Sequence, residues 1–250
     1  MAKIIRFEWG QAIRYGVVDG DSVFSIEGGI LGDFSIGKKL CNVSDAKLLA
    51  PVKPKIVVCV GGNYYRLLKE AGMEIPSEPS SFFKPSSSVV GYLDNIIYPK
   101  VSNDVSFAGE LAVIMKYEAR NVPEDRALEY VLGYTCGNDL TAHDIPERFS
   151  TRAKSFYTFC PLGPCIATDI NPDNLKIRSR LNGVLIQDDS TSDMIFNVSQ
   201  IISYITGFMA LEPLDVILTG TSRRETKINI GDIIEIEIEG IGILRNTVTQ

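Results

Sequence analysis

The chain has 250 residues, of which 45% are hydrophobic and 22% are charged, ordinary values for a soluble globular protein. Its 31 acidic and 25 basic side chains give a formal net charge of −6, which argues against a nucleic-acid binder, because such proteins carry a basic surface for phosphates. No apolar run approaches the roughly 18 residues of a membrane-spanning helix, and Arg6 and Glu8 interrupt the start too early for a signal peptide. We therefore expect a cytoplasmic protein whose partners include neither a nucleic acid nor a membrane.

Five cysteines and one histidine narrow the possible chemistry. The cysteines are odd in number and contain no C-x-x-C pair, which argues against a disulfide framework or a cysteine-rich zinc site. We expect all five to behave as small hydrophobic residues. Because His143 is the only histidine, a site with two imidazole ligands is impossible. Any metal must therefore be a hard cation held mainly by carboxylates and water.

Residues 1–50 are predicted to form a small β domain. The β-rich runs KIIRFE and IRYGVV are followed by a turn at Asp19-Gly20 and by a third run, SVFSI. Pro51 and Pro54 then interrupt the pattern. We place the domain border near residue 50, with residues 51–250 forming the second domain.

The second domain mixes strands with short helices. The run KIVVCV at 55–60 is typical of a buried strand, and the segments 64–71 and 124–132 are predicted helices. Within 195–206 the apolar residues recur at the spacing of one helix face. Isoleucine and glutamate alternate over 234–239, which predicts a strand with one buried face. Without a regular βαβ rhythm, the pattern favours a β-rich α+β fold over a doubly wound parallel sheet.

Three polar residues beside apolar runs are candidates for chemistry. Glu110 precedes LAVIM and lies either at the rim of a buried region or, more commonly for a glutamate, at a solvated strand edge. Asp139 follows Asn138 and is either a turn residue or a ligand of Mg²⁺ or Mn²⁺. Lys154 precedes an aromatic stretch and is either an electrostatic stabiliser of an enolate or an ordinary surface lysine.

Two further features are less specific. The segment TGTSRRE at 219–225 follows a strand-like run, and its hydroxyls, N–H groups and arginines either hold a carboxylate or close the strand as a polar loop. His143 is either an acid–base group with a tunable pKa or a structural residue. No phosphate-binding P-loop, G-x-G-x-x-G or G-x-S-x-G motif is present.

Eight collinear segments between residues 54 and 248 resemble the fumarylacetoacetate hydrolase family. They are KIVVCVGGNYY, FFKPSSSVVG, GELAVIM, EYVLGYTCGNDLTAHD, KSFYTFCPLGP, NGVLIQDDSTSDMIF, LEPLDVILTGTS and GDIIEIEIEGIGILRN. The resemblance implies a mixed β-sandwich roll with a small N-terminal β domain, assembled as a homodimer. It also implies Mg²⁺ or Mn²⁺ that chelates a 2-oxo acid or β-diketone. The reactions that it implies are C–C hydrolysis, decarboxylation, dehydration, and tautomerisation or isomerisation of enol acids.

The metal site that the resemblance implies is incomplete. Glu110 and Asp139 match two of its carboxylate ligands, but Ala108 stands where the family's Glu-x-Glu pattern has its first glutamate. Lys154 is retained, whereas Tyr157 replaces the aspartate that normally follows it. Since Mg²⁺ accepts water in place of a missing carboxylate, we expect the cation to bind more weakly.

The acid–base and substrate positions also differ. Leu67 replaces the histidine of the family's water-activating dyad, while its partner Glu70 persists. His143 stands where the family has an arginine, and Pro146 stands where it has a glutamine. The TGTPxG loop keeps its threonines, including Thr221, but carries Ser222 for proline and Arg224 for glycine. Because leucine cannot accept a proton, the hydrolytic branch of the family is expected to be impaired.

Two hypotheses remain. In the first, the protein is a metal-dependent enzyme acting on a small anionic oxo acid or enol acid, since enolisation and decarboxylation depend less on an activated water. Its site then comprises metal ligands Glu110 and Asp139, catalytic residues Lys154, Glu70 and His143, and substrate-binding residues Thr221, Arg224 and Tyr157. In the second, the four changes at Leu67, Ala108, Pro146 and Tyr157 mark a catalytically impaired member that serves as a metal-free binding or assembly module.

Overall fold

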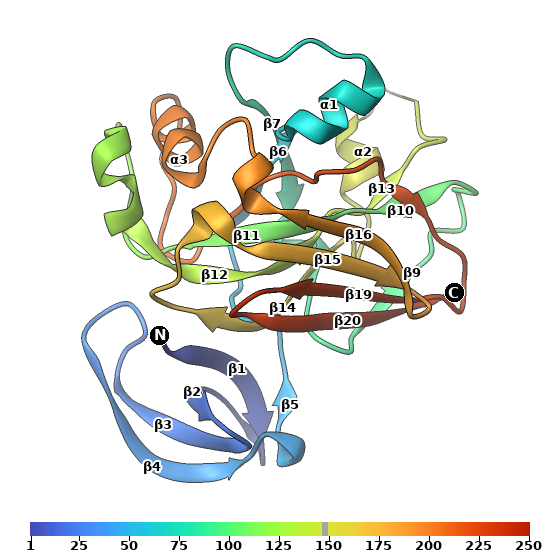
Figure 1. Ribbon diagram of the computed structural model, residues 1–250. Helices are drawn as coiled ribbons and strands as arrows, with labels where there is room; N and C mark the ends of the chain where they lie inside the picture. The colour runs from blue at the N-terminus through green and yellow to red at the C-terminus, as the bar shows by residue number, and fades with distance from the viewer. Residues whose placement is uncertain (147–149) are drawn as a thin grey trace.

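A mixed sheet of twelve strands runs through the molecule in the computed structural model, which describes residues 1–146 and 150–250. Its strands are β1 (Lys3–Trp9), β2 (Ala12–Asp19), β3 (Ser22–Gly28), β4 (Phe34–Asn42), β5 (Lys47–Leu48), β6 (Ile56–Gly61), β7 (Ser80–Pro85), β8 (Val89–Val90), β11 (Gly109–Met115), β12 (Val131–Asn138), β14 (Cys160–Ala167) and β17 (Val216–Leu218). They follow the order β4-β3-β2-β1-β14-β12-β11-β17-β6-β7, with β5 beside β1 and β8 beside β14. Figure 1 shows this sheet continuing from the blue N-terminal lobe into the rest of the chain.

Two smaller sheets complete the β-rich fold. The five-stranded sheet contains, in spatial order, β16 (Val184–Ser190), β15 (Lys176–Leu181), β19 (Ile233–Ile238), β20 (Gly242–Thr249) and β9 (Asn95–Ile97). The three-stranded sheet contains β13 (Thr141–Ala142), β10 (Val105–Phe107) and β18 (Thr226–Lys227). Strands β19 and β20 pack against β12 and β14, so the five-stranded sheet and the long sheet form the predicted sandwich (Figure 1).

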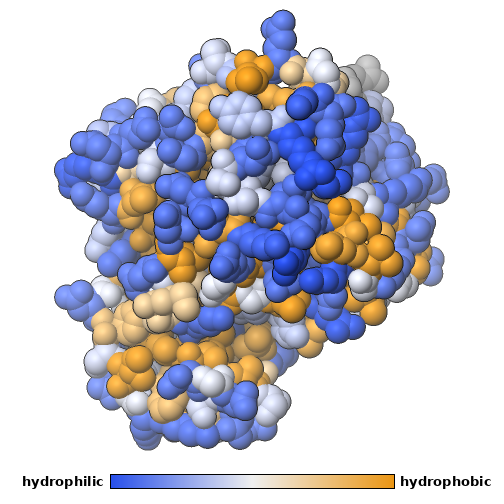
Figure 2. Space-filling model, in the orientation of Figure 1, coloured by the Kyte–Doolittle hydropathy of each residue, from blue (hydrophilic) through white to orange (hydrophobic). Residues whose placement is uncertain are grey.

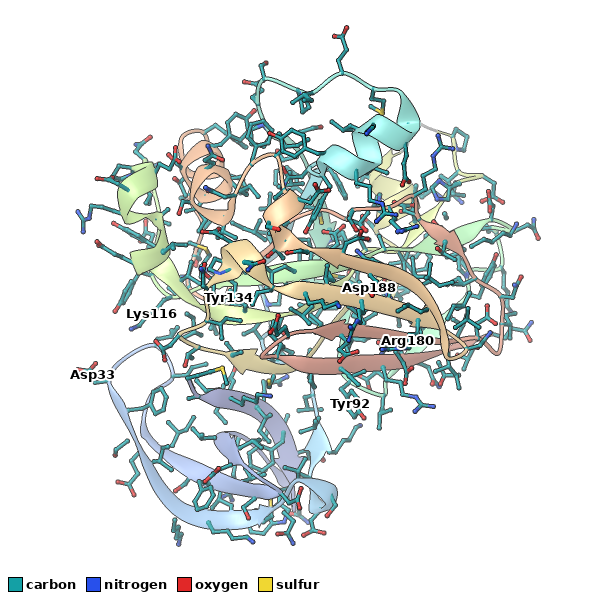
Figure 3. All side chains as sticks on the ribbon, in the orientation of Figure 1. Asp33, Tyr92, Lys116, Tyr134, Arg180 and Asp188 are labelled. Carbon is teal, nitrogen blue, oxygen red and sulfur yellow. The ribbon has the colours of Figure 1, made fainter. Side chains whose placement is uncertain are left out.

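Alternation of side chains along β19 explains this packing. Ile234, Ile236 and Ile238 are each 1% exposed and belong to the core between the sheets. Charged side chains lie on the outer face, where Figure 3 shows Arg180 and Asp188. The predicted strand at 234–239 is therefore confirmed with its predicted buried face.

Short helices cover the sheet ends. They are α1 (Tyr65–Ala71), α2 (Ser150–Lys154) and α3 (Val198–Thr206), together with the 3₁₀ turns η1 (Val43–Asp45), η2 (Ser86–Ser88), η3 (Glu124–Tyr130), η5 (Pro172–Asn174) and η6 (Thr191–Asp193). Asn197 caps α3, because its side-chain oxygen accepts from the Gln200 N–H at 2.9 Å, while the Asn197 N–H donates to Gln200 Oε1 at 3.0 Å. The predicted helices at 64–71 and within 195–206 are thus confirmed.

The prediction of an α-helix over 124–132 is wrong both in helix type and in where the helix ends. Residues Glu124–Tyr130 form a 3₁₀ helix in which only Ala127 is buried, and the strand β12 begins at Val131. The apolar end of this segment pairs with β11, where the ladder satisfies backbone groups that a helix end would leave open.

The predicted N-terminal unit is hydrogen-bonded to the remainder of the chain. Lys3 and Ile4 of β1 pair with Ala167 and Ile166 of β14. The strands predicted before and after Asp19-Gly20 are confirmed as β1, β2 and β3. The border near residue 50 remains a prediction.

Burial of the apolar residues agrees with the sequence. All five cysteines lie in the described residues, where each is buried and free of a disulfide. Among residues 1–146 and 150–250, no helix is both long enough and apolar enough to cross a bilayer.

Both faces of β11 are covered, one by the core that contains Leu111 and Val113 and the other by a second core that contains Ala112 and Ile114.

The packing of β19 gives a stability prediction. Ile236→Ala is expected to lower the free energy of unfolding by about 2–5 kcal/mol, because the cavity left between the sheets cannot fully collapse. Glu235→Ala on the other face should lower the free energy of unfolding by less than about 1 kcal/mol, since it removes only a surface ion pair with Arg245 at 3.6 Å. Urea unfolding of both variants measures the difference, and equal losses would contradict the assigned faces.

Candidate functional site

A cavity of about 400 Å³ lies at one edge of the long sheet. Strands β6 and β17 are parallel, whereas β11 is antiparallel to both β17 and β12, so the ends of β6, β12 and β17 meet the start of β11. The cavity is lined by Val60, Gly61, Gly62, Leu67, Glu110, Asp139, His143, Lys154, Thr221, Arg223, Arg224 and Glu225. Strand topology thus gathers residues that are far apart in the sequence.

Glu110 lies inside the fold and is only 3% exposed, so the solvated-edge interpretation is wrong. The reason is that β11 is covered on both faces. The Gly220 N–H donates to Glu110 Oε2 at 2.7 Å. Gly220 has φ +95°, and a Cβ there would lie 2.9 Å from the Val60 carbonyl oxygen, so glycine is needed for this approach. Burial and the Asp139 carboxylate raise the pKa of Glu110 well above its usual range.

Asp139 is a buried ion-pair partner, and its interpretation as a turn residue is wrong. Its backbone exchanges hydrogen bonds with Ala108, at 2.9 Å from the Asp139 N–H and 3.1 Å from the Ala108 N–H. Its carboxylate Oδ1 lies 2.7 Å from Lys84 Nζ, and Oδ2 lies 2.6 Å from Lys154 Nζ. The Asp139 side chain is only 4% exposed, so the two ammonium groups are needed to offset the cost of burying its negative charge.

Lys84 was missed by the sequence analysis, although its position inside the apolar segment FFKP was a signal. Its side chain is fully buried and donates to the carbonyl oxygens of Leu140, Lys154 and Phe159 at 2.8, 2.8 and 2.9 Å. These carbonyls belong to the segment after β12, the end of α2 and the residue before β14. Lys84 therefore holds three segments of the site together.

Lys154 is held in one orientation at the cavity wall. Its ammonium group donates to Asp139 Oδ2 and Thr141 Oγ1, both at 2.6 Å, and to Glu225 Oε1 at 3.2 Å. Although burial works to lower it, the carboxylates of Asp139 and Glu225 raise the pKa of Lys154. The side chain is 16% exposed and charged, so the surface-lysine interpretation is wrong.

Glu225 is a third carboxylate in the cavity that sequence analysis did not single out. Its Oε1 accepts from Thr141 Oγ1 at 3.0 Å, and its Oε2 lies 2.7 Å from His143 Nε2 and 2.8 Å from Ser106 Oγ. Burial opposes ionisation, but the His143 hydrogen bond and the Lys154 charge together lower the pKa of Glu225 to about 2. The sequence offered one weak signal, an acidic residue closing a loop rich in hydroxyls and arginine.

Of the remaining predicted site residues, the cavity receives Thr221 and Arg224. Arg224 is exposed at the cavity, whereas its neighbour Arg223 is held by Asp189 at 3.3 Å. Asp189 also accepts a bond from Ser222 Oγ at 2.8 Å. Figure 2 shows mainly hydrophilic residues on the face between α1 and the five-stranded sheet.

Glu70 and Tyr157 are not brought into the cavity. Glu70 pairs with Arg66 at 3.0 Å and is 45% exposed, whereas Leu67 from the same helix lines the cavity. Tyr157 is 73% exposed, so it does not crowd the cavity. Pro146 is exposed and immediately precedes the residues outside the described part of the chain.

Glu110 and Asp139, the two ligands predicted for a divalent cation, both line the cavity. Among the described residues, no three His, Cys, Asp or Glu side chains are grouped for metal binding, and Ala108 offers only a methyl group. Burial, and after it the charge of the Asp139 carboxylate, raise the pKa of Glu110, and a cation beside the pair would oppose both effects. The two carboxylates are oxygen ligands of the kind that Mg²⁺ or Mn²⁺ accepts together with water, but both Asp139 oxygens are already paired with lysine ammonium groups.

Known proteins resemble this chain in sequence and in fold. Residues 56–249 match the fumarylacetoacetate hydrolase C-terminal family model, and residues 2–51 match the Rv2993c-like N-terminal model. An uncharacterized protein of Archaeoglobus fulgidus is 47% identical over 206 residues, which are 82% of each chain. The mitochondrial oxaloacetate tautomerase fahd2 of Xenopus laevis is 36% identical over 220 residues, covering 82% of this chain and 69% of that protein. The crystal structure of 2-hydroxyhepta-2,4-diene-1,7-dioate isomerase from Mycobacterium marinum has a TM-score of 0.92 and 35% identity, covering 100% of this chain and 98% of that one.

Lys84→Met is expected to lower the free energy of unfolding by about 3–5 kcal/mol, because it removes one partner of a buried ion pair and three hydrogen bonds to carbonyl oxygens. Lys55→Met serves as the control, since Lys55 pairs with Glu212 on the surface and such pairs contribute little. Denaturant unfolding followed by tryptophan fluorescence measures both. A Lys84 variant as stable as the control would contradict the organising role of this ammonium group.

Calorimetry tests the two-carboxylate metal site. Wild-type protein is expected to bind Mn²⁺, more tightly with oxalate as an oxo-acid mimic, because oxalate supplies the oxygen ligands that the protein lacks. Glu110→Gln should lose this binding, whereas Glu129→Gln, a surface change beside Arg126, should keep it. Undiminished binding in Glu110→Gln would remove this residue from the ligand set.

Proposed function

Because the chain belongs to the fumarylacetoacetate hydrolase family, we propose that it is an enzyme that interconverts the keto and enol forms of a small 2-oxo acid. The observation that carries this proposal is the charged Lys154 ammonium group, fixed by three oxygen partners in a cavity of about 400 Å³. The tautomerase and isomerase named among similar proteins support the reaction class.

The chemistry requires stabilisation of an enolate. When a proton leaves the carbon beside a carbonyl, negative charge develops on the carbonyl oxygen. A fixed cation stabilises that charge without having to reorganise. Lys154 is already held by Asp139, Thr141 and Glu225, so its orientation is set before substrate arrives.

The substrate carboxylate is assigned to the loop after β17. Thr221 offers a hydroxyl group at the cavity wall, and Arg224 offers an exposed guanidinium group. Arginine binds carboxylates through two parallel hydrogen bonds, which suits a small dianion or monoanion. Arg223 is already paired with Asp189, so Arg224 is the better candidate for this contact.

Mg²⁺ or Mn²⁺ is proposed as the cofactor, held by Glu110 and Asp139 with water in place of the ligand missing at Ala108. When bound, the cation supplies Lewis-acid stabilisation of the enolate oxygen. Hydrolysis is disfavoured, since Leu67 lines the cavity and Glu70 is turned to Arg66 outside it. Cytoplasmic location and a homodimer remain predictions, and light scattering of the purified protein tests the latter.

A metal-free binding module is the second candidate. It is favoured by the pairing of both Asp139 oxygens with Lys84 and Lys154, which leaves this carboxylate electrostatically compensated without a metal ion. Such a module would bind an anion through Arg224 and Lys154 without converting it. Turnover of any oxo acid excludes this alternative.

Lys154→Met is expected to reduce kcat by about 10²–10³-fold, the usual effect of removing one stabilising donor from an anionic transition state. Ultraviolet absorbance of enol-oxaloacetate follows the reaction with Mg²⁺ present. Lys176→Met on the five-stranded sheet is the matched control, because Lys176 is half-exposed and pairs with Asp188 on the surface. Unchanged kcat in a folded Lys154→Met protein would refute the proposed role, and an inactive wild type with every oxo acid tried would favour the binding module.

A further inference from the structure

Three side chains form a closed hydrogen-bonded triangle at the wall of the cavity. Ser106 Oγ lies 2.6 Å from His143 Nε2 and 2.8 Å from Glu225 Oε2, and the last two atoms are 2.7 Å apart. The small sheet brings them together. Ser106 is on the central strand β10, His143 follows β13, and Glu225 precedes β18. Figure 1 shows β10 and β13 beside α2, which carries Lys154.

Both contacts of the imidazole ring use the same nitrogen. Since Glu225 is a carboxylate that accepts, Nε2 carries the hydrogen and Nδ1 carries a lone pair. Within the described residues, Nδ1 has no hydrogen-bond partner, and the His143 side chain is 45% exposed where it lines the cavity. This leaves one ring nitrogen available to a substrate.

The triangle is not a serine nucleophile with its base. In such a triad the serine and the carboxylate contact different ring nitrogens, so that the proton can pass through the ring. Here Ser106 and Glu225 share Nε2, and Ser106 is only 3% exposed and does not line the cavity. Ser106 and Glu225 therefore fix the ring.

We propose that His143 is the general acid–base of the cavity and that Glu225, with Ser106, is its positioning residue. His143 and Glu225 would then perform the proton transfer that Leu67 on α1 cannot perform, because leucine has no group that accepts a proton. This inference rests on the proposed function and goes beyond it by assigning the proton transfer to an element other than α1. Glu225 contacts both His143 and Lys154, so one carboxylate orients both the base and the ammonium group that stabilises the enolate.

The proton transfer balances without a co-reactant. His143 Nδ1 takes the proton from the carbon beside the carbonyl, and the C–H electron pair forms the C=C bond. The carbonyl π pair moves to oxygen, beside the Lys154 ammonium group. The imidazolium then returns the proton to that oxygen, directly or through one water. The net result is isomerisation of the keto form to the enol.

The charges around the ring set its proton affinity. The hydrogen bond from His143 to Glu225 raises the pKa of His143, with smaller help from Asp104 and against burial and the Lys154 charge. Asp104 itself pairs with Lys227 at 3.2 Å, and Arg224 lines the same cavity. Since Glu225 stays ionised down to about pH 2, it supports the imidazolium over the whole working range. The free base, which starts the reaction from the keto acid, forms as the pH rises through the raised pKa.

The single histidine makes a direct measurement possible, because His143 gives the only imidazole resonances of the chain. We would titrate them by ¹H–¹³C NMR in wild type, Glu225→Gln and Asp104→Asn. Glu225→Gln is expected to lower the pKa by about one unit, tenfold in proton affinity. Asp104→Asn removes a nearby carboxylate that is not bonded to the ring, and it should shift the pKa less. Equal shifts in the two variants would overturn the positioning role.

Turnover separates this inference from the function on which it rests. His143→Gln should lower kcat for oxaloacetate tautomerisation by about 10²–10⁴-fold. Glu225→Gln should also lower kcat, and it should move the acidic limb of the pH–rate profile to lower pH, in step with the NMR titration. Full activity in His143→Gln overturns the inference and leaves the proposed function standing. A wild type without turnover overturns both, while the NMR comparison still reports whether Glu225 controls the ring.

Discussion

The site depends on one buried carboxylate shared by two ammonium groups. Asp139 lies between Lys84 and Lys154, at 2.7 and 2.6 Å, and all three side chains are largely withdrawn from water. Burying three charged side chains is costly unless their geometry is good and the remaining N–H groups of the lysines have hydrogen-bond acceptors. Lys84 meets this condition by donating to three carbonyls, which also fixes the position of α2. The orientation of Lys154, and with it the proposed enolate stabilisation, follows from this arrangement.

Glu225 changes the charge balance of the cavity. Ala108 leaves the position before β11 without a carboxylate, whereas Glu225 supplies one from the loop before β18, so three carboxylates line the cavity together with Glu110 and Asp139. Two of them touch ammonium or imidazole groups, whereas Glu110 relies on a backbone N–H. Burial and the nearby Asp139 charge therefore raise the pKa of Glu110, whereas the His143 hydrogen bond and the Lys154 charge outweigh burial and lower that of Glu225. A cation would therefore gain most beside Glu110.

Sequence patterns predicted the strands better than the site. Alternating isoleucines identified β19, and the apolar spacing identified α3, because both patterns reflect local periodicity. The burial of Glu110 was misjudged, since a glutamate before an apolar run reveals nothing about a second sheet above it. Lys84 and Glu225 were missed because their partners lie far along the chain, with 119 residues separating Ser106 from Glu225. The collinear segments of the family resemblance supplied the long-range information that periodicity lacks.

Relatives that share this fold do not settle which chemistry the cavity performs, because function resides in particular side chains. In this chain α1 offers Leu67 to the cavity, and the imidazole comes from the segment after β13 instead. A base on a different element approaches the substrate from a different direction, so it selects a different C–H bond or a different face of the enolate. In the proposed mechanism, a substrate must match the position of His143 relative to Lys154 and Arg224, which line the same cavity.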